Sequence, residues 1–550
     1  MRKPFAITLD PGSSLANHTG SWRTSRPEYL DRLPPCNNAC PAGENIQAWL
    51  FHAESGDYEA AWRSLVENNP LPAIMGRVCY HPCEGACNRG QLDAAVGINS
   101  VERFLGDEAL KRGWTFPPPA AVTGKRVLVV GAGPSGLSAA YHLARLGHAV
   151  TIREAGPFAG GMMRFGIPKY RLPREVLDAE VKRILDLGVR LELNTKVDDV
   201  LEAIKAGGFD AAFLAVGAHI AKRAYIPAGE AAKILDAVQV LRDMEGPGRG
   251  AGDQEYTKPL LGRRVVVYGG GNTAIDVART AKRMGAEEAI IVYRRTREKM
   301  PAHPFEVEEA LEEGVLIKWL STIKQAGETS ITVEKMVLDA KGVPQPTGEL
   351  ETLEADSVVL ALGQDVDLSL LEHVPGLEKV DGVVKVGPNM MTGHPGIFAG
   401  GDMVPAERTV TVAVGHGKKA ARHIDAWLRG GIHDPGPKHE IADFAKLNAW
   451  YYADASKTVR PVLDLARRTS SFDEVVQGLD ESNALFEARR CLSCGNCFEC
   501  DNCYGVCPDN AVVKLGPGNR FRFNYDYCKG CGMCAAECPC GAIRMVPEEI

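Results

Sequence analysis

The sequence has no long hydrophobic run, no excess of basic charge and no histidine in its last part. No uninterrupted stretch of about 18 apolar residues is present, which excludes a conventional membrane-spanning helix. The formal net charge is −7 and no long basic run occurs, so neither nucleic acid nor an anionic membrane is an expected partner. The opening residues, MRKPFAITLDPG, lack the apolar core of a signal peptide, and we therefore expect a soluble, cytoplasmic protein.

Cysteine is absent from the long middle of the chain. All 16 cysteines lie either between residues 36 and 87 or between residues 491 and 540. The second group contains the bacterial ferredoxin spacing C-x2-C-x2-C-x3-C-P twice, and in such pairs the fourth cysteine of each repeat ligates the other cluster. The spacing therefore predicts two 4Fe-4S clusters, one held by Cys497, Cys500, Cys503 and Cys538 and the other by Cys528, Cys531, Cys534 and Cys507.

Zinc is the main alternative for closely spaced cysteines. Zinc sites favour two C-x2-C pairs separated by about a dozen or more residues, often with histidine, but no histidine follows His439. The doubled ferredoxin spacing therefore favours iron over zinc. Cys540 lies outside both repeats, and we interpret it as a core cysteine without a ligand role.

The first of two glycine-rich turns begins at Gly131, between a predicted strand over 125–130 and a predicted helix over 137–146. Glycines let the backbone turn tightly and approach a pyrophosphate, which then lies against the free amides at the helix N-terminus. Glu154 ends the next predicted strand, 149–153, about 20 residues on, where a carboxylate can accept from ribose hydroxyls. The candidate binding residues are Gly131, Gly133, Pro134, Ser135, Gly136 and Glu154.

The second glycine-rich turn follows a predicted strand over 264–268 and precedes a predicted helix over 275–284. Its candidate binding residues are Gly269, Gly271, Asn272, Thr273 and Ala274. No acid ends the next predicted strand, 289–293, and Arg294, Arg295 and Arg297 follow it instead. A carboxylate would repel a 2'-phosphate whereas guanidinium groups bind it bidentately, so we predict NADP(H) rather than NAD(H). A solvated arginine cluster is the alternative interpretation.

Two dinucleotide turns in one chain suggest that one unit is inserted in the other. Residues 356–363 close the inserted unit, and 396–402 return to a strand end where Gly401 and Asp402 can contact a flavin ribityl chain. The resulting fold class is an α/β multidomain protein with a helical N-terminal iron–sulfur domain, two Rossmann-like domains and an α+β ferredoxin-like C-terminal domain.

At 550 residues the chain is long enough for roughly three or four domains. Segments rich in proline and glycine at 113–119, 245–252 and 434–437 predict linkers or long loops. The residue pattern predicts helices over 45–54 and 58–67 and a largely helical connection over 441–487. We place an iron–sulfur domain at 1–120, an FAD-binding domain at 121–257 and 364–435, an NAD(P)H-binding domain at 258–363, a helical linker at 436–490 and a ferredoxin-like domain at 491–550.

Six ordered motifs occur between residues 35 and 301. They are PCNNACP at 35–41, GRVCYHPCEGAC at 76–87, GAGPSG at 131–136, Gly160-Gly161 with GIP at 166–168, GGGNTAIDVA at 269–278 and YRRTREKMP at 293–301. From Cys36 to about Arg429 the chain thereby resembles the glutamate synthase small-subunit-like flavoproteins, which include the N-terminal half of dihydropyrimidine dehydrogenase and the large subunit of NADH-dependent ferredoxin:NADP oxidoreductase. The resemblance implies FAD at the first turn, with Gly161 among its contacts, NAD(P)H at the second, and two N-terminal 4Fe-4S clusters.

The chain departs from this family at its start. Relatives open with a cysteine segment shortly before the position of Cys36, and this chain has none there. The N-terminal segment therefore supplies only five thiolates, whereas two clusters need eight ligands. Arg490-Cys491-Leu492-Ser493-Cys494 resembles the missing segment, and Glu102 matches the family's non-cysteine oxygen ligand. The resemblance thus implies one cluster on Cys36, Cys87, Cys491 and Cys494 and another on Cys40, Cys79, Cys83 and Glu102. The alternative is that Glu102 is a surface helix residue and the two late cysteines are spare.

The predicted function is that of an NAD(P)H:ferredoxin-type oxidoreductase. Electrons would pass between NADPH and a partner protein, either a ferredoxin or a redox enzyme subunit, through FAD and four 4Fe-4S clusters. We name no acid–base catalyst, and we interpret His394 and His416 as structural. The alternative is a non-autonomous electron-transfer subunit of a hetero-oligomeric complex, of the 2-oxoacid oxidoreductase, aromatic-ring reductase or glutamate synthase type. Electron bifurcation and the direction of electron flow are not decided by the sequence.

Overall fold

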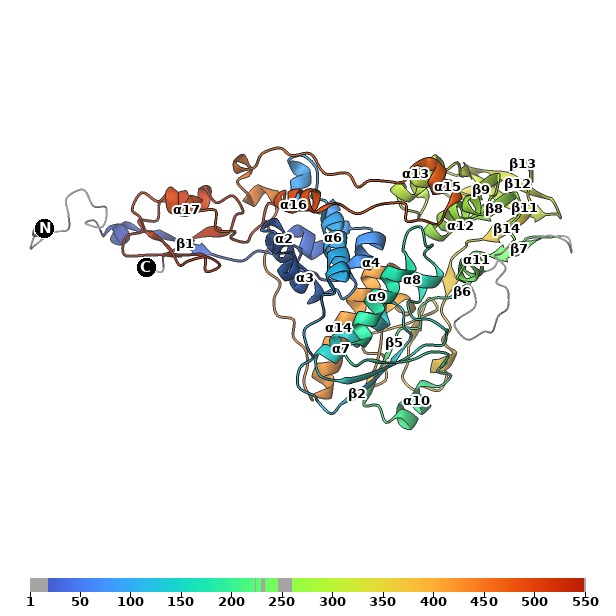
Figure 1. Ribbon diagram of the computed structural model, residues 1–550, viewed down its shortest axis with the longest axis horizontal. Coiled ribbons are helices and arrows are strands. Elements are labelled where there is room, and N and C mark those ends of the chain that lie inside the picture. The colour runs from blue at the N-terminus through green and yellow to red at the C-terminus, as the bar shows by residue number, and fades with distance from the viewer. Residues whose placement is uncertain (1–17, 223, 229–232, 246–259, 549–550) are drawn as a thin grey trace, which may run out of the picture.

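The computed structural model describes residues 18–222, 224–228, 233–245 and 260–548. Figure 1 shows an elongated molecule in which β1, near the start of the described chain, lies beside α17, near its end, at one extremity. A helical body occupies the middle, one α/β unit lies below it, and a second α/β unit forms the opposite extremity. No helix within the described ranges is long and apolar enough to cross a bilayer.

The first α/β unit is built on a five-stranded sheet in which neighbouring strands run parallel, in the order β18-β5-β2-β3-β4. Residues 127–130 of β2 are all buried, as expected for a parallel strand covered on both faces. Helices α7 and α14 pack against each other beside this sheet. The bounds are β2 Arg126–Val130, β3 Ala149–Arg153, β4 Arg190–Glu192, β5 Ala211–Leu214, β18 Ile397–Ala399, α7 Pro134–Arg145 and α14 Val410–Leu428.

The second α/β unit has its own parallel sheet, in the order β10-β9-β8-β14-β7. The chain leaves the first sheet after β5 and returns to it at β18, so the predicted insertion is confirmed. The second sheet includes β7, which lies before the expected domain start at 258; three residues are too few to show a strand period in the sequence. The bounds are β7 Ile234–Asp236, β8 Arg264–Tyr268, β9 Glu288–Val292, β10 Leu316–Lys318, β14 Ser357–Leu360, α12 Asn272–Arg283 and α13 Pro304–Glu312.

The remaining elements of the two units join and cover these sheets. An antiparallel sheet, β11-β12-β13, extends the second unit, and β6 pairs with β15 where the chain enters and leaves it. The bounds are β6 Ile220–Ala221, β11 Ser321–Ala326, β12 Ser330–Leu338, β13 Pro344–Glu354, β15 Gln364–Asp365, β16 Lys379–Val380, β17 Val383–Val384, α8 Met162–Phe165, α9 Arg174–Leu185, α10 Val200–Gly207 and α11 Ala237–Asp243.

The central body is helical, as the sequence predicts. Asn45 and Asp57 cap α2 and α3 by accepting from the backbone amides of Ala48 and Ala60, which explains why the two expected helices begin there. Trp49, Leu50, Leu65 and Leu105 form part of its core. The bounds are α1 Pro35–Ala39, α2 Ile46–Glu54, α3 Tyr58–Val66, α4 Pro72–Val78, α5 Pro82–Gly85 and α6 Ile98–Arg112.

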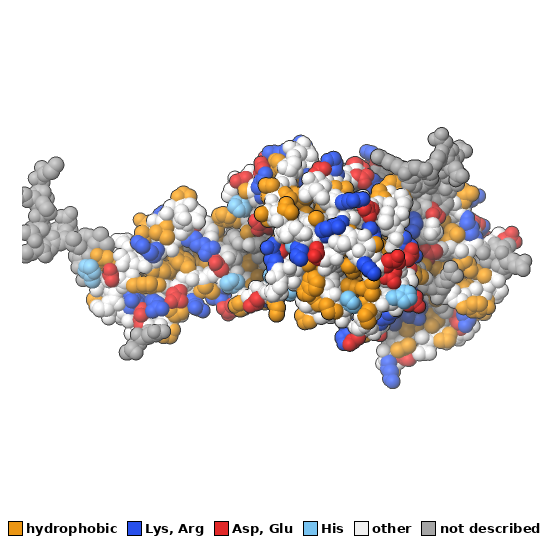
Figure 2. Space-filling view, turned by 90° about the horizontal axis from the view of Figure 1, so that it is seen from below, with side chains coloured by type: hydrophobic (Ala, Val, Ile, Leu, Met, Phe, Trp, Pro, Cys, Tyr) orange, Lys and Arg blue, Asp and Glu red, His pale blue; other side chains and the backbone are white. Residues whose placement is uncertain are grey.

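The C-terminal unit contains a strand from the other end of the chain. β1 (Ser25–Tyr29) pairs antiparallel with β21 (Ile543–Pro547), so residues ahead of the N-terminal cysteines complete this unit. The other elements are β19 Val512–Lys514, β20 Phe521–Phe523, α17 Asn502–Gly505 and α18 Met533–Ala536. Figure 2 shows the unit as a narrow lobe whose visible face mixes acidic and basic side chains.

The expectation of a largely helical connection over 441–487 is wrong. Two short helices, α15 (Leu465–Ser470) and α16 (Glu481–Arg489), are separated by irregular chain. Asp464 and Asp480 cap them, accepting from the amides of Arg467 and Asn483. The rest of the segment lies across other units and satisfies its backbone there, as Val475 does by donating to the Tyr170 carbonyl at 2.9 Å.

Candidate functional site

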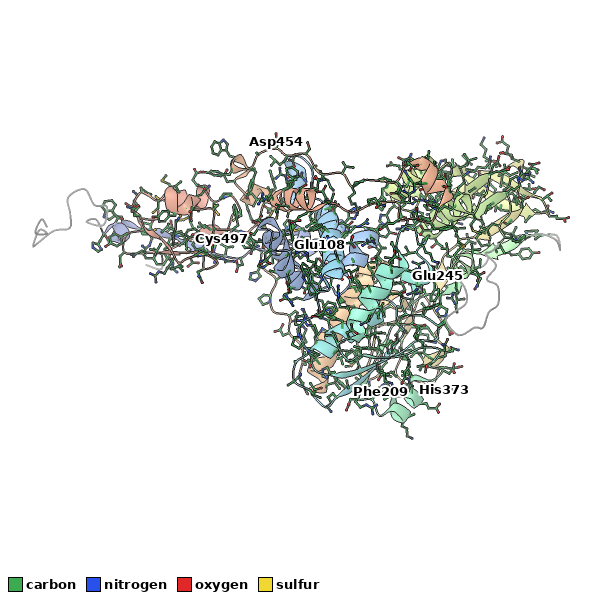
Figure 3. All side chains as sticks on the ribbon, viewed as in Figure 1. Glu108, Phe209, Glu245, His373, Asp454 and Cys497 are labelled. Atoms are coloured by element: carbon green, nitrogen blue, oxygen red, sulfur yellow. The ribbon has the colours of Figure 1, made fainter. Side chains whose placement is uncertain are left out.

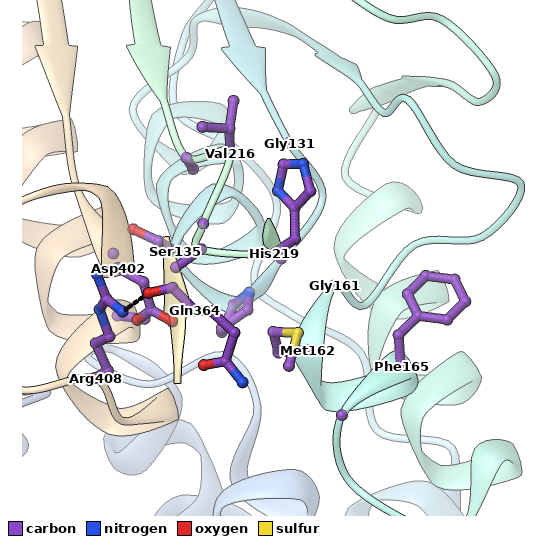
Figure 4. Close-up of a pocket in the computed structure, with 18 of the residues that line it drawn as sticks. Gly131, Ser135, Gly161, Met162, Phe165, Val216, His219, Gln364, Asp402 and Arg408 are labelled. Carbon is purple, nitrogen blue, oxygen red and sulfur yellow. Dashed lines mark hydrogen bonds between the residues drawn. The ribbon is translucent and has the colours of Figure 1, made fainter. Parts of the chain in front are cut away.

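A cavity of about 1140 Å³ lies between the two α/β units and is lined by residues of both. Figure 4 shows part of its wall, with Ser135, Asp402, Gln364 and Arg408 close together on one side and Met162 and Phe165 on another. It brings together most of the candidate nucleotide-binding residues: Gly131, Gly133, Pro134, Ser135, Glu154, Gly161, Gly271, Asn272, Thr273, Gly401 and Asp402. Gly136, Gly269, Ala274, Arg294 and Arg295 are not among the residues that line it.

The first glycine-rich turn has the geometry of an anion cradle. Gly131 has a φ of 103°, and a Cβ there would stand 2.4 Å from the Ala215 carbonyl oxygen. Gly133 is the N-cap of α7 and offers no side chain to the first helical amides. Ser135 Oγ is buried without a hydrogen-bond partner among the described residues. Free amides and an orphaned hydroxyl at a helix N-terminus fit a pyrophosphate.

Glu154 closes the same turn from the end of β3. Its Oε2 accepts from the Ala132 amide and its Oε1 from the Gly156 amide, both at 2.8 Å. Each carboxylate oxygen retains lone-pair capacity, so the side chain can still accept from a ribose hydroxyl in the cavity. The carboxylate thus orders the loops on either side of the predicted ribose position.

The Gly401–Asp402 turn lines the same cavity as Gly161. The Gly401 amide donates to Nδ1 of His416 at 3.1 Å. Burial raises the pKa of Asp402, and the nearby Arg408 guanidinium opposes this rise. Arg408 in turn donates to the Gln364 carbonyl at 2.7 Å, so the returning chain is tied to the exit of the inserted unit (Figure 4).

The second turn is built like the first. Gly269 has a φ of 147°, a Cβ there would stand 2.2 Å from the Ala361 carbonyl oxygen, and Gly271 caps α12 without a side chain. Asn272 donates to the Tyr80 hydroxyl at 2.6 Å and accepts from the His303 amide at 3.0 Å. This ties the turn to the cysteine-bearing segment of the central body. Arg294 and Arg295 follow β9 on the exposed surface.

The structure gathers the four side chains of the first implied N-terminal set, which we call the Glu102 set: Cys40, Cys79, Cys83 and Glu102. Burial raises the pKa of Cys83, and so do the charges of Cys79, Cys40 and Glu102. Thr411 of α14 donates to Cys79 Sγ at 3.1 Å. Glu102 is only 6 % exposed, which contradicts the alternative of a surface helix residue.

The second N-terminal set joins residues more than 400 positions apart in the sequence. We call it the Cys491 set: Cys36, Cys87, Cys491 and Cys494. Burial, together with the charges of Cys491, Cys87 and Cys494, raises the pKa of Cys36 well above its usual range. Asn88 donates to Cys494 Sγ at 3.3 Å. Cys491 packs with Cys36 and Cys87 against the core of the helical body, so the late cysteines lie beside the N-terminal thiols.

The tail gathers the two sets that the ferredoxin spacing predicts. In the Cys497 set (Cys497, Cys500, Cys503 and Cys538), burial and the other three thiolates raise the pKa of Cys503 to about 11. In the Cys528 set (Cys528, Cys531, Cys534 and Cys507), burial and the neighbouring thiolates raise the pKa of Cys534 to about 12. Cys497 lies where the tail meets the central body (Figure 3).

Each set supplies four ligand side chains, the number that a 4Fe-4S cluster takes. No three His, Cys, Asp or Glu side chains of the described residues converge closely enough to hold one metal ion. A 4Fe-4S cluster instead takes one ligand on each of its irons, which spreads the four ligands around it. Cys540 Sγ lies 3.8 Å from Cys538 Sγ, and this hydrogen bond lowers the pKa of Cys538 and raises that of Cys540. Cys540 thereby shares a hydrogen bond with a predicted ligand.

Comparisons with known proteins identify the family of the chain and its 4Fe-4S segments. The profile of the pyridine nucleotide-disulphide oxidoreductase family matches residues 125–417. The profile of dihydropyrimidine dehydrogenase domain II, 4Fe-4S cluster, matches residues 31–114, and that of a 4Fe-4S binding domain matches residues 521–544. The chain belongs to the pyridine nucleotide-disulphide oxidoreductase family.

Relatives of this oxidoreductase come from several bacteria. It is 37% identical over 506 residues to the NADP(+)-dependent formate dehydrogenase subunit beta of Moorella thermoacetica, covering 84% of this chain and 70% of the relative. It is 34% identical over 523 residues to the NADPH-Fe(3+) oxidoreductase subunit beta of Geobacter sulfurreducens, covering 85% and 76%. It is 33% identical over 430 residues to the glutamate synthase [NADPH] small chain of Escherichia coli, covering 72% and 89%. The predicted family resemblance is confirmed.

The chain is therefore an oxidoreductase with FAD- and NADP-binding units and 4Fe-4S domains. Several residues of the site were missed in the sequence. Tyr80 lines the cavity, and its ring stacks on that of His303 with centroids 3.5 Å apart. Tyr29 of β1 shares a hydrogen bond of 3.1 Å with Cys503 Sγ. A tyrosine flanked by Cys79 and His81 was a signal for Tyr80, whereas Tyr29 carries no local signal.

Proposed function

We propose that this oxidoreductase passes electrons between NADPH and a redox partner protein that docks at the ferredoxin-like tail. The observation that carries the proposal is the arrangement of the four ligand sets. The members of each set lie close together, and a short piece of chain links each set to the next. Bound FAD supplies the exchange between a two-electron donor and one-electron carriers. The residues of the chain bind, orient and shield these groups.

The Glu102 set lies beside the cavity. Cys79 stands between Val78 and Tyr80, and both of these line the cavity. Thr411, the donor to Cys79 Sγ, follows Val410, which also lines the cavity. These contacts support the Glu102 set as the first electron acceptor after FAD.

The other sets follow along the molecule. Cys36 and Cys40 lie one helical turn apart at α1, which joins the Glu102 set to the Cys491 set. Cys494 and Cys497 are separated by two residues, which joins the Cys491 set to the Cys497 set. Burial and the charges of Cys540 and Cys494 raise the pKa of Tyr452, which therefore lies between these two sets. The sequence of four clusters would run from the cavity into the tail.

The two α/β units then have distinct roles. We assign FAD to the first unit and NADP(H) to the second, which begins at β7 rather than at residue 258. Arg294 and Arg295 are exposed just after β9, which supports recognition of a 2'-phosphate. Replacing both by alanine should raise the KM for NADPH about tenfold and leave the KM for NADH unchanged, as measured by steady-state dye reduction. An equal change in the KM for both nucleotides would contradict this role.

The physiological acceptor is expected to be another protein. Two relatives are named as beta subunits, which favours the second candidate function, an electron-transfer subunit of a larger complex. Co-purification from the native host, followed by NADPH oxidation assays with and without the bound subunits, distinguishes the two. An autonomous enzyme keeps its activity with a ferredoxin after the subunits are removed.

Tail variants test the proposed electron path. Cys531→Ser with Cys534→Ser should preserve NADPH-driven reduction of a small dye while abolishing reduction of a protein acceptor. The unaltered protein should contain about 16 irons per chain, from four clusters. Full reduction of the protein acceptor by the double variant would overturn the proposed exit through the tail.

A further inference from the structure

One buried polar side chain contacts the Glu102 set without being one of its four predicted ligands. Asn69, in the loop between α3 and α4, has no exposed surface, and its side chain points at two acidic residues. Its Nδ2 donates to Glu102 Oε1 and to Glu44 Oε1, each at 2.9 Å. Its Oδ1 accepts from the Leu71 amide at 3.0 Å. The amide therefore uses both donor hydrogens on the two carboxylates.

The orientation of this amide is determined by its partners. Carboxylate oxygens can only accept and a backbone N–H can only donate, so the reverse placement of nitrogen and oxygen would leave three buried groups unsatisfied. Asn69 is also anchored by its own amide, which donates to the Leu65 carbonyl at 3.1 Å. The side chain is thus fixed by the end of α3 and the start of α4.

Glu44 serves as a second anchor. It is 5 % exposed, and its other oxygen, Oε2, accepts from Nε1 of the buried Trp49 at 3.2 Å. Both oxygens of Glu44 are therefore engaged away from the thiols. In contrast, Glu102 has only Oε1 engaged in a hydrogen bond within the described part of the chain.

We propose that Asn69 is a positioning residue that holds Oε1 of Glu102 and so directs Oε2 toward the iron of the cluster. The inference rests on the proposed function, in which Glu102 is the fourth ligand of its set. A carboxylate side chain on a helix has several rotamers and two equivalent oxygens, and only a fixed rotamer places one oxygen on a metal repeatedly. The Asn69 amide supplies that restriction and itself carries no charge.

The experiment compares iron release and the electron paramagnetic resonance signal of the reduced protein, using the holoprotein throughout. Asn69→Leu preserves side-chain size and removes both donors. We expect iron from one cluster to be lost to a chelator about tenfold faster, in line with other hydrogen-bond partners of metal ligands, and the signal of that cluster to change. Asn99→Leu is the matched control, because Asn99 is also buried and donates to the Met75 carbonyl at 3.0 Å without touching Glu102.

The Glu102→Cys background separates positioning from general structural support. A thiolate at position 102 does not depend on the amide, so Asn69→Leu should change iron release less than twofold there. An equal effect in both backgrounds, or an effect of Asn99→Leu as large as that of Asn69→Leu, would overturn the inference. If Asn69→Leu does not fold, Asn69→Ser gives a comparable test, since its hydroxyl keeps an acceptor for the Leu71 amide but has one donor hydrogen in place of the two that the carboxylates use.

A separate variant tests the ligand assignment itself. If Glu102→Ala leaves the iron content and the resonance signal unchanged, Glu102 is not a ligand, and the proposed ligand set fails together with the inference. If Glu102→Ala alters the signal while Asn69→Leu does not, only the positioning role is overturned.

Discussion

At the scale of single residues, the flavin side of the cavity depends on a neutral histidine. The Gly401 amide donates to Nδ1 of His416, so this nitrogen must be free of a proton. Burial and the nearby Lys419 lower the pKa of His416. Because the folded pKa is lower than the unfolded value, the unfolded chain binds more protons below about pH 6.5, and stability is lost as the pH falls through that range.

We therefore expect FAD to be released more readily at pH 5.5 than at pH 7.5. In His416→Asn the side-chain oxygen can accept from Gly401 without titrating, and FAD retention should vary less with pH. Flavin fluorescence after desalting measures the released fraction. His394→Gln is the control, because Nδ1 of His394 lies 2.9 Å from the Pro395 carbonyl oxygen, outside the flavin turn. The same pH profile in His416→Asn as in the unaltered protein would contradict this role.

The residues that the sequence predicted are those whose chemistry is local. Gly131 needs a positive φ and close backbone contact, and both requirements are set by its own turn. The tail cysteines follow a fixed sequence spacing that is typical of 4Fe-4S ligands, so this signal is local as well. Asn69, Tyr80 and His416 act through partners far away in the sequence, and no period or spacing predicts such a contact. The pairing of late cysteines with Cys36 was predicted only through family resemblance and ligand counting.

At the scale of elements, β1 determines the environment of a tail cysteine. Its antiparallel pairing with β21 places Tyr29 opposite Ile543, and the Tyr29 ring stacks on Phe523 at 4.8 Å between centroids. The Tyr29 hydroxyl then reaches Cys503 Sγ. This strand was not predicted, because five residues containing a proline give a weak strand signal away from their partner.

Removing this hydroxyl should change the reduction potential of one tail cluster. Hydrogen bonds to cluster sulfur stabilise the more negative, reduced form, so Tyr29→Phe should lower the potential of the Cys497 set. A potentiometric titration monitored by electron paramagnetic resonance measures it. Tyr525→Phe is the control, because the Tyr525 hydroxyl donates to the Pro27 carbonyl at 2.9 Å and not to sulfur. An equal shift in both variants would show that the effect comes from strand packing.

At the scale of the whole molecule, the segment 455–480 connects units that are distant in the sequence. Its α15 packs on α12 of the second α/β unit, at the opposite end of the molecule from the tail (Figure 1). On either side of α15 the segment contacts the central body: Lys457 pairs with Glu84 at 2.6 Å, and Glu474 pairs with Arg77 at 2.7 Å. The connection that we expected to be a helical linker thus holds the nucleotide-binding unit against the helical body.

One buried carboxylate is the centre of this contact. Glu313 of the second unit accepts from Arg279 and Arg283, and also from Arg468 of α15 at 3.2 Å. Burial opposes its ionisation, but the hydrogen bonds from the first two arginines outweigh burial and lower its pKa to about 2. Because the folded pKa of Glu313 lies below the unfolded value, its contribution to the free energy of unfolding is fully present above about pH 4.3. This contribution is lost as the pH falls toward 2. The stabilisation from this contact should therefore not vary with pH between 5 and 8.

Arg468→Ala tests whether this contact fixes the second unit. Glu313 keeps two arginine partners, so we expect a loss of about 1–3 kcal/mol in local stability rather than unfolding. Amide hydrogen exchange across α15 and α12 should accelerate, while exchange in the tail stays unchanged. Arg467→Ala is the matched control, since Arg467 is 60% exposed at its side chain and pairs only with Asp473 among the described residues. Equal acceleration in both variants would mean that α15 is held by its apolar contacts and not by the buried arginine.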